Sequence, residues 1–555
     1  MAKFSRLVRD RFQEAFADAD ALQRIPVFCK PEALKAGSLV RFRCMVQDPS
    51  YGEELHLSVA RIVNPETGET QQKFSQYTDA EHCLPDGWEV DYGSPGNVFT
   101  EKEVAYCVSV PGLNPWAQLE TPASLESAMD ALSLATGSAE EGGSAAAAAV
   151  EADELKYPLR GERHTAAMVK FYSPSAAPKV STVVDVVGIF ELGHNSRAKD
   201  ADGERAAWPC IHAIYWSEAA PGRLVPGVSA PVCGEYADRR AMCLAHLASI
   251  LGGDELAAQY LLLHLLSRTV CVQDATVGKF SLNLVGMPAQ AKAPAEPARF
   301  ALSGPAARRI GDAVAQLVPL SVEVPFELAL LNRAAFAPSA EQGDLQAGVL
   351  QLASGTEVVC DETCLHEGTL GERGVRNLHA LQTAILSQSV GYAYPYQTIE
   401  MPTDLRVLVL SVGKSILHND CGVHLSKDAA QFLARVQAGE AAELRPLDPM
   451  HAEQLRQYLE TARSLEFTIP KDVSDAISGE YADMRRAAHE QGARLMTQEE
   501  LALTVTVARL VSISKGEARL SRASWQEARA LERARAERAA QAKGPRPASA
   551  SPPPS

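Results

Sequence analysis

Alternating apolar and polar positions near the start of the chain give its first regular pattern. The stretch Leu39–Gln47 alternates in part, which is typical of a half-buried β-strand. Leu55–Ile62 and Val104–Val110 are similar in composition, and turn signals containing Gly and Pro separate them. We therefore expect residues 1–120 to form an N-terminal β-rich module.

An abrupt change of composition follows at residues 121–158. Between Thr121 and Leu155 the chain has seven acidic and no basic side chains, and it includes a run of five alanines. Such a stretch cannot bury enough apolar surface to form a core. The pattern predicts a mobile acidic linker rich in Ala, Gly and Ser.

A second set of apolar runs begins beyond this linker. Ala167–Tyr172, Val180–Phe190 and Ile211–Trp216 each have the length and β-branched content of a strand. Gly188 lies inside the second run, which favours a curved strand. We expect a small barrel, an OB-like β module, over residues 159–235.

The pattern becomes α/β over residues 236–470. Glu255–Ser267 has the helical spacing but is apolar nearly all round, so this helix should be buried. Ala306–Leu317 and Asn377–Ser387 are further predicted helices, and short apolar runs alternate with them. This alternation predicts a mainly parallel sheet covered by helices. The runs expected to be strands are Phe280–Val285, Val322–Val324, Val349–Leu352, Val358–Cys360 and Leu405–Leu410.

Residues 471–541 should form a helical, lid-like domain. Thr497 followed three residues later by Glu500 has the form of a capping box, and Ser524 with Glu527 repeats it. The remaining residues, 542–555, are rich in Pro and Ser and should form a disordered tail.

Composition and charge narrow the class of protein. The chain has 555 residues, 46% of them hydrophobic, which suits a globular protein of several domains. We find no apolar run long enough to span a bilayer and no secretory signal, so we expect a nuclear or cytosolic location without a membrane partner. The net charge of −16 repels phosphate backbones and favours protein partners over nucleic acids.

One stretch in the α/β region has the outline of a phosphate-binding P-loop. The predicted strand Phe280–Val285 leads into Gly286, and Lys292 follows at the required spacing. Ala293, however, stands where a hydroxyl group would bind magnesium. Backbone N–H donors are also missing at Pro288, Pro294 and Pro297. An ordinary loop after a buried strand is the favoured interpretation.

A second strand ends in the acidic pair Asp361 and Glu362. In an active ATPase, the Asp of such a pair would belong to the coordination shell of the metal ion, and the Glu would polarise the attacking water. Because no working P-loop precedes them, we interpret both residues as remnants of a nucleotide site or as acids with a structural role. Gly413-Lys414-Ser415 lacks the leading glycine of a P-loop, so we expect an ordinary turn there.

Eleven cysteines without a CxxC pair give no sign of a disulfide framework or zinc site. We therefore predict no catalytic residues, no metal and no cofactor.

Several of these segments together resemble the minichromosome maintenance (MCM) complex-binding protein family. The resemblance covers most of the chain except the linker and the tail. The segments that carry it are Leu39–Asp48, Ala105–Gly112, Gly253–Ser267, Gly278–Pro288, Gly348–Leu370 and Leu510–Glu532.

The α/β region is also similar to the ATPase domain of the MCM helicase, but its catalytic motifs are degenerate. The resemblance implies a degenerate AAA+/MCM-like α/β domain, with β-rich modules before it and a helical lid after it. Gly286, Lys292, Asp361 and Glu362 would be remnants of the nucleotide site. Ser411 would replace the polar sensor, normally Asn, after the next strand.

The resemblance implies a non-enzymatic regulator of DNA replication that binds MCM helicase subunits. It would act in the nucleus, and also in the cytoplasm, on the assembly, nuclear supply and unloading of the helicase. Chromatin contact would be indirect, and a role in sister-chromatid cohesion is associated with the family. Two alternatives stay open: an active ATPase remodeller using Lys292, Asp361 and Glu362, and a direct nucleic-acid binder. Arg41, Arg43 and the Arg-rich helix between Arg529 and Arg538 support only the second.

Overall fold

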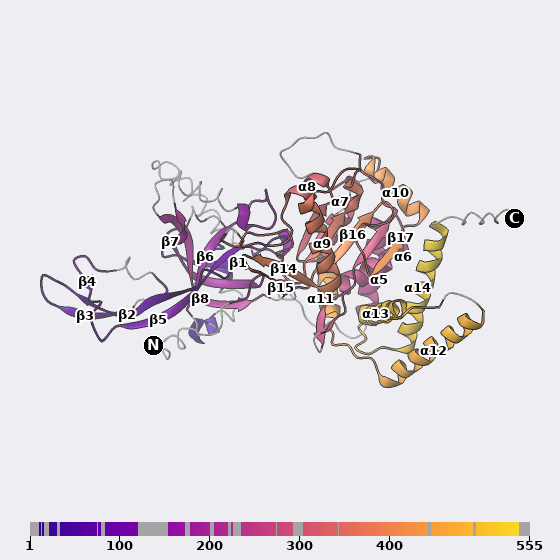
Figure 1. Ribbon diagram of the computed structural model, residues 1–555. Helices are drawn as coiled ribbons and strands as arrows, with labels where there is room; N and C mark the ends of the chain where they lie inside the picture. Colours follow the sequence, from indigo (N-terminus) through magenta and orange to yellow (C-terminus); the bar gives the residue numbers. More distant parts are fainter. Residues whose placement is uncertain are drawn as a thin grey trace.

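The computed structural model has a β-rich half and an α/β half that lie side by side (Figure 1). Within the described part of the chain, no helix has the length and apolar character needed to cross a bilayer. The structure describes residues 10–12, 14–15, 22–29, 31, 34–74, 76–78, 84–119, 154–172, 178–199, 205–219, 224–225, 235–272, 275–291, 303–341, 343–441, 444, 446–491 and 495–542.

Five strands of the β-rich half close into a barrel. Neighbouring strands pair in the order β1, β7, β8, β6, β5, and β5 pairs again with β1. All pairs are antiparallel except β6 with β8. The strands are β1 (Leu39–Asp48), β5 (Val98–Ser109), β6 (Ala166–Phe171), β7 (Val183–Lys199) and β8 (Arg205–Glu218).

Alternation along these strands fills the barrel with apolar side chains. Val40, Phe42 and Cys44 of β1 point into one buried cluster, and Phe28 packs edge-on against Phe42 at a centroid distance of 5.0 Å. Gly188 lies beside a β-bulge, where a Cβ atom would approach the carbonyl oxygen of His212 to 2.4 Å. A glycine is therefore needed where β7 bends against β8.

The barrel differs from the two separate modules that we predicted. Strands β1 and β5 come from residues 1–120, and β6, β7 and β8 come from residues 159–235. Hydrophobic spacing shows where strands lie but not which strands pair across a long linker, so the prediction split one sheet into two. Most of the predicted linker lies outside the described residues. Its last residues, Glu154–Lys156, form a 3₁₀ turn, and Leu155 accepts a backbone hydrogen bond from Ala347.

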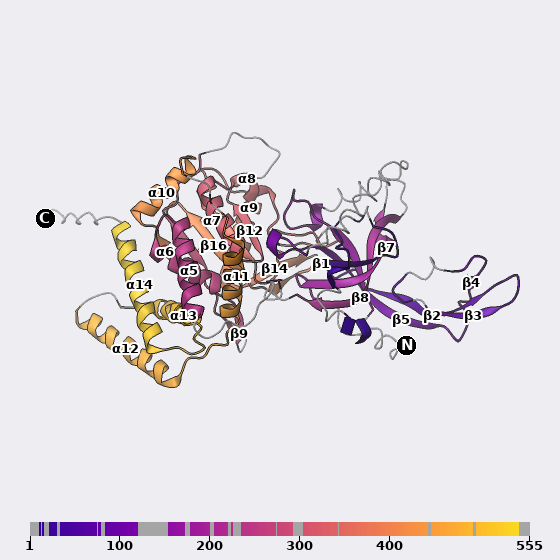
Figure 2. The same ribbon diagram turned by 180° about the vertical axis from the view of Figure 1, so that it is seen from behind.

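An extension of the sheet, which we name the arm, lies between β1 and the barrel part of β5. It consists of residues 53–74 and 84–103, and it projects away from the α/β half in both views (Figures 1 and 2). Its strands are β2 (Glu53–Val63), β3 (Thr70–Phe74), β4 (Glu89–Val90) and the first part of β5.

The second sheet is wholly parallel and has the order β12, β13, β16, β11, β17. Its edge strand β17 was not predicted. The strands are β11 (Leu282–Val285), β12 (Ser321–Pro325), β13 (Glu357–Asp361), β16 (Arg406–Ser411) and β17 (Cys421–His424).

Helices cover both faces of this sheet, as predicted. Leu408 and Leu410 of β16 point into the larger core, whereas Val407 and Val409 point into the smaller one. The larger core is built with α5 (Glu235–Ile250), α6 (Glu255–Leu266), α7 (Pro305–Leu317), α10 (Lys427–Gln437) and α11 (Pro449–Arg463). The smaller core is built with α8 (Leu328–Arg333), α9 (Glu372–Ser387) and the hairpin β14 (Ser389–Tyr394) and β15 (Gln397–Pro402). A second hairpin joins β9 (Val270–Val272) to β10 (Ala275–Val277).

Residues 349–352, predicted as a strand, have no ladder partner and form a buried loop. Leu350 and Leu352 are buried in the smaller core. Gln351 donates to the backbone oxygen of Gln47, and its own Oε1 lies 3.3 Å from Gln47 Nε2. Burial without sheet pairing therefore explains the misleading pattern.

The C-terminal helices are α12 (Lys471–Glu490), α13 (Gln498–Ser514) and α14 (Arg522–Ala542). The capping box of Thr497 and Glu500 is present as predicted. The second capping box is wrong, because α14 begins earlier and Ser521 Oγ accepts the N–H of Ser524. Val507, Leu510 and Trp525 join the larger core, so α13 and α14 pack as part of the α/β half.

Candidate functional site

The predicted nucleotide site lies where β11, β13 and β16 end. The N–H groups of Gly286 and Met287 both donate to the carbonyl oxygen of Ser411, at 2.9 and 3.0 Å. Gly286 has φ of +100°, a left-handed conformation that lets the chain turn across the end of β16. The backbone therefore folds onto its own sheet instead of forming an open phosphate cradle.

The next part of the loop is held by the turn after β13. Gln290 donates its backbone N–H to Thr363 at 3.1 Å, and its Oε1 accepts from the Cys364 thiol at 2.9 Å. A P-loop needs such N–H groups to point at phosphate. Lys292, Ala293, Pro294 and Pro297 lie outside the described residues.

The first helix after this loop is α7, which begins at Pro305 rather than directly after the glycine. Ala306 N–H donates to Oε1 of Gln437 at 3.0 Å, so a side chain of α10 caps this helix. A Cβ atom at Gly304 would lie 3.0 Å or less from Gln437 and Gln290 side-chain atoms. Two amide side chains thus fill the space that an anion would need at the helix start.

The acidic pair serves local structure. Asp361 is fully buried and accepts hydrogen bonds from the N–H and hydroxyl of Thr363 at 2.9 and 2.6 Å, and its other oxygen accepts from the Cys364 thiol. Asp361 therefore caps the turn Glu362–Cys364. Both carboxylate oxygens of Asp361 therefore already accept hydrogen bonds from residues of this turn.

Glu362 holds the loop between β16 and β17. Its Oε1 accepts from the Ser415 hydroxyl at 2.7 Å and from Ile416 N–H at 3.3 Å. Burial raises the pKa of Glu362, and these two hydrogen bonds act against that rise. Ser415 belongs to the Gly413-Lys414-Ser415 tripeptide, which contacts the site as a structural turn. Ser411 Oγ lies 2.9 Å from both Asn283 Oδ1 and the oxygen of Gly413.

The structure thus brings Gly286, Asp361 and Glu362 to one edge of the sheet, as the order of the motifs suggested. Sequence reasoning missed the residues that occupy this edge, Gln290 and Gln437, since an isolated glutamine in a loop or helix end has no distinctive pattern. Among the described residues, no group of three or more His, Cys, Asp or Glu side chains is placed to hold a metal ion.

Comparison with known proteins assigns the chain to a family. The family described as "Mini-chromosome maintenance replisome factor" matches residues 12–141 and 126–539. The chain belongs to this family. The second matched range contains Gly286, Lys292, Asp361 and Glu362.

Relatives in this family come from animals and plants. Each is named "Mini-chromosome maintenance complex-binding protein". The protein of Danio rerio is 29% identical, with 92% of this chain and 90% of the relative covered. The human protein is 27% identical over 97% and 95%, and that of Arabidopsis thaliana 27% over 96% and 93%. The likeness therefore spans both halves of the molecule.

Apart from Arg533, which is exposed, the arginines considered for nucleic-acid contact are buried or pair with carboxylates of the same chain. Arg43 makes a bidentate pair with Asp185, at 2.7 and 2.9 Å, and Arg41 is buried. On α14, each of three arginines has a carboxylate partner. These pairs are Arg529 with Glu480, Arg535 with Glu532, and Arg538 with Asp254.

A firm junction joins the barrel to the α/β half. Trp116 donates its indole N–H to the oxygen of Ala315 at 2.8 Å, and the Arg456 guanidinium lies 3.9 Å from the centroid of its ring system. Asn114 donates to Val318 O, and Ser321 N–H donates to Gly112 O. These contacts fix the orientation of the two halves.

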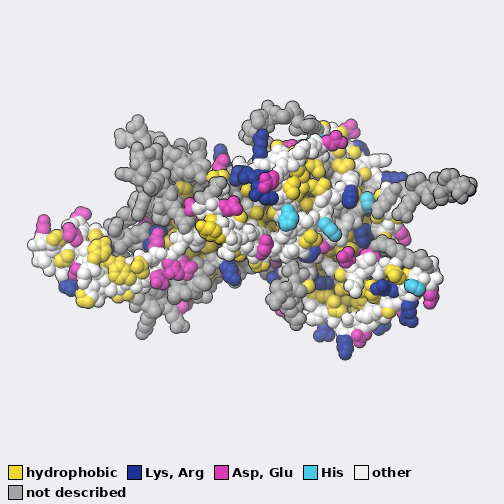
Figure 3. Space-filling model, viewed as in Figure 1, with side chains coloured by type: hydrophobic (Ala, Val, Ile, Leu, Met, Phe, Trp, Pro, Cys, Tyr) yellow, Lys and Arg dark blue, Asp and Glu magenta, His cyan; other side chains and the backbone are white. Residues whose placement is uncertain are grey.

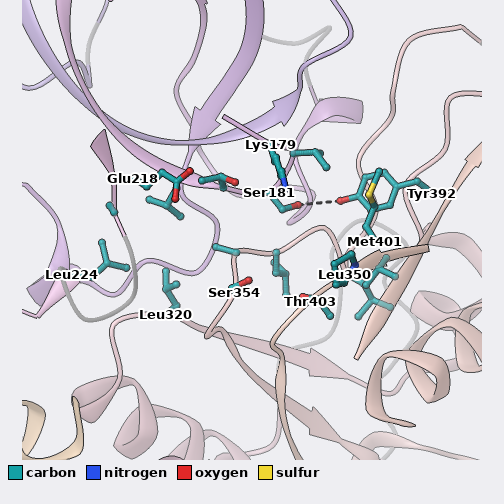
Figure 4. Close-up of a pocket in the computed structure, with 18 residues that line it drawn as sticks. Lys179, Ser181, Glu218, Leu224, Leu320, Leu350, Ser354, Tyr392, Met401 and Thr403 are labelled. Atoms are coloured by element: carbon teal, nitrogen blue, oxygen red, sulfur yellow. Dashed lines mark hydrogen bonds between the residues drawn. The ribbon is translucent and has the colours of Figure 1, made fainter. Parts of the chain in front are cut away.

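A cavity of about 330 Å³ lies at the same junction (Figure 4). Leu320 and Leu350 contribute apolar surface, and the hydroxyls of Ser181 and Tyr392 point toward each other at 3.0 Å. Lys179 is also part of the lining. The lining contains no nucleophile paired with a base, so we assign no reaction to it.

Proposed function

We propose that this chain is a non-catalytic regulator of DNA replication that binds subunits of the MCM helicase. In this proposal the α/β half is a degenerate AAA+/MCM-like ATPase domain that docks beside a helicase subunit as a substitute neighbour. It acts in the nucleus, and also in the cytoplasm, on subunit assembly, nuclear supply and unloading from chromatin. A contribution to sister-chromatid cohesion and indirect contact with chromatin belong to the same proposal.

The observation that carries the proposal is the filled nucleotide site in a member of this family. Gly286 and Met287 donate to Ser411, while Gln437 caps α7. The donors that would grip a triphosphate therefore have partners inside the protein. The names of the relatives support the MCM complex as the partner. A protein that keeps a subunit-like shape without an ATP cycle can cap or open a ring of active subunits.

The test uses the full-length protein with purified MCM subunits, offered singly and in pairs. We expect a stable complex in size-exclusion chromatography with light scattering, equally with and without ATP and magnesium. We also expect no ATP hydrolysis above a buffer control. Lys292→Ala should leave complex formation unchanged, because this lysine is not needed for a nucleotide.

Two results would favour the competing functions. Magnesium-dependent ATP binding that Lys292→Ala abolishes would support an active remodeller. A salt-dependent shift of DNA by the purified protein would support a direct nucleic-acid binder. Absence of any complex with MCM subunits would overturn the proposal itself.

A further inference from the structure

Apolar side chains on the arm are exposed to solvent although a small core lies nearby. Leu57, Ala60 and Ile62 of β2 pack with Trp88 and Val90 into that core. Leu55, Tyr92 and Phe99 stay outside it and are 73%, 65% and 53% exposed. The arm thus already has an apolar cluster for its own folding, and these three side chains add surface that its stability does not need.

The sheet register places two of these side chains on one face. Leu57 lies directly opposite Phe99, so both point to the same side. Leu55 lies two residues before Leu57 on β2 and shares this side. Leu55 and Phe99 therefore form one apolar patch on this face of the arm. Hydrophobic side chains are visible on the arm in Figure 3, with acidic side chains among them.

Charge decides what kind of partner fits this patch. The described residues of the arm have nine acidic and three basic side chains. Of the basic ones, Lys102 is only 5% exposed and pairs with Glu54. Glu53, Glu66 and Glu101 are among the exposed acids. An anionic surface with exposed apolar groups repels nucleic acid and attracts a basic protein surface.

The place of the arm in the fold agrees with a binding role. It interrupts the connection between β1 and β5, which are the first two barrel strands along the chain. The arm also projects away from the α/β half in both ribbon views (Figures 1 and 2), so a partner can reach it without contact with the junction.

We infer that the arm is a docking surface for a protein partner with an apolar recess bordered by Lys and Arg. The inference rests on the proposed function, in which that partner is a helicase subunit. Leu55 and Phe99 enter the recess, and the acidic side chains of the arm face its basic border. The contact accelerates association through charge and slows dissociation through apolar burial.

The experiment compares the full-length double variant Leu55→Ser/Phe99→Ser with a matched control, Val375→Ser/Met450→Ser. The control residues are 57% and 66% exposed but belong to the α/β half. Affinity for purified MCM subunits is measured by biolayer interferometry. We expect the arm variant to bind at least about tenfold more weakly and the control to match wild type. Melting curves of both variants should overlay that of wild type, since exposed side chains are changed.

A charge variant tests the second part of the inference. Glu66→Lys/Glu69→Lys changes two exposed acids in the hairpin between β2 and β3. The association rate should fall several-fold at low salt, and raising the salt concentration should reduce the difference from wild type.

The outcomes separate this inference from the proposed function. If wild type binds no subunit, the proposed function fails. If wild type binds and the Leu55→Ser/Phe99→Ser variant binds equally well, the arm is not the docking surface and only the inference is overturned. The inference is also overturned if light scattering shows that the wild type is a dimer and the arm variant a monomer, because the patch would then join two copies of this chain.

Discussion

A buried charged cluster at the amino-terminal end of the parallel sheet offers a stringent test of the fold. Glu357 on β13 is completely buried and lies 2.6 Å from Nε2 of His264 and 3.0 Å from Nε of Arg406. Nδ1 of His264 faces the oxygen of Phe280 at 2.7 Å. Both ring nitrogens of His264 therefore face oxygen atoms. Glu357 contacts a buried histidine and a buried arginine through its two carboxylate oxygens.

We expect Glu357→Gln to destabilise the α/β half by about 3–5 kcal/mol, since removal of one partner leaves buried charge uncompensated. For a large domain, the loss corresponds to a fall in melting temperature of roughly 6–20 °C. Circular dichroism during heating measures it. The control is Glu367→Gln, which neutralises an exposed glutamate and should melt within about 1 °C of wild type. Equal melting of Glu357→Gln and wild type would refute the electrostatic reasoning.

The same variant makes a pH prediction with a definite sign. Burial raises the pKa of Glu357, but the charges and hydrogen bonds of His264 and Arg406 outweigh burial, so the net pKa is lowered. The folded state thus binds the Glu357 proton more weakly than the unfolded state. The stabilisation is complete above the unfolded pKa, about 4.3, and is lost as the pH falls through the lower folded value. The difference in melting temperature between wild type and Glu357→Gln should therefore shrink below about pH 4.

Three other changes test the junction, the barrel and a helix end. Trp116→Ala removes the hydrogen bond to Ala315 and the stacking of Arg456, and should lower the free energy of unfolding by about 2–3 kcal/mol. Limited proteolysis should then cut more readily between the two halves. Unchanged cleavage would show that the junction does not depend on Trp116. Gly188→Ala places a Cβ atom against the oxygen of His212 and should lower stability by about 1–3 kcal/mol, measured by urea denaturation; a neutral result would mean that β7 shifts freely. Thr497→Ala removes the cap of α13 and should cost about 1 kcal/mol, detected as faster amide exchange in its first turn, with Thr506→Ala as the control.

Local patterns predicted the individual elements well where side-chain periodicity and burial coincide. The strand at Leu39–Gln47 is confirmed as β1; one of its faces lines the barrel, and the other is also largely buried, since Met45 and Gln47 are inaccessible to solvent. The cap at Thr497 is confirmed because a capping box depends on residues three positions apart. The strand before Asp361 is confirmed because both of its faces are buried in a parallel sheet.

Pairing and site geometry could not be predicted in this way, because both depend on residues far apart in sequence. The barrel closes through contacts between segments on either side of residues 121–158. Gly286 and Lys292 have the spacing of a P-loop, yet the start of α7 and the position of Gln437 decide whether phosphate could bind. Gln437 lies 131 residues from the N–H group of Ala306 that it accepts.

If the α/β half is the degenerate ATPase domain that we propose, the hydrogen bonds at the carboxyl edge of its sheet also remove the usual source of motion in an ATPase. In an active enzyme, loops at this edge rearrange because the γ-phosphate and magnesium hold them differently before and after hydrolysis. Here Glu362 holds the β16–β17 loop through Ser415, and Gln290 holds the glycine loop through Thr363, so no ligand is required for either position. A ligand shifts an equilibrium only by its differential affinity for two states, and these loops are already held in one conformation by bonds within the protein. Under the proposed function, the complex with helicase subunits should therefore form equally with and without ATP and magnesium, while this chain supplies a fixed shape and an arm.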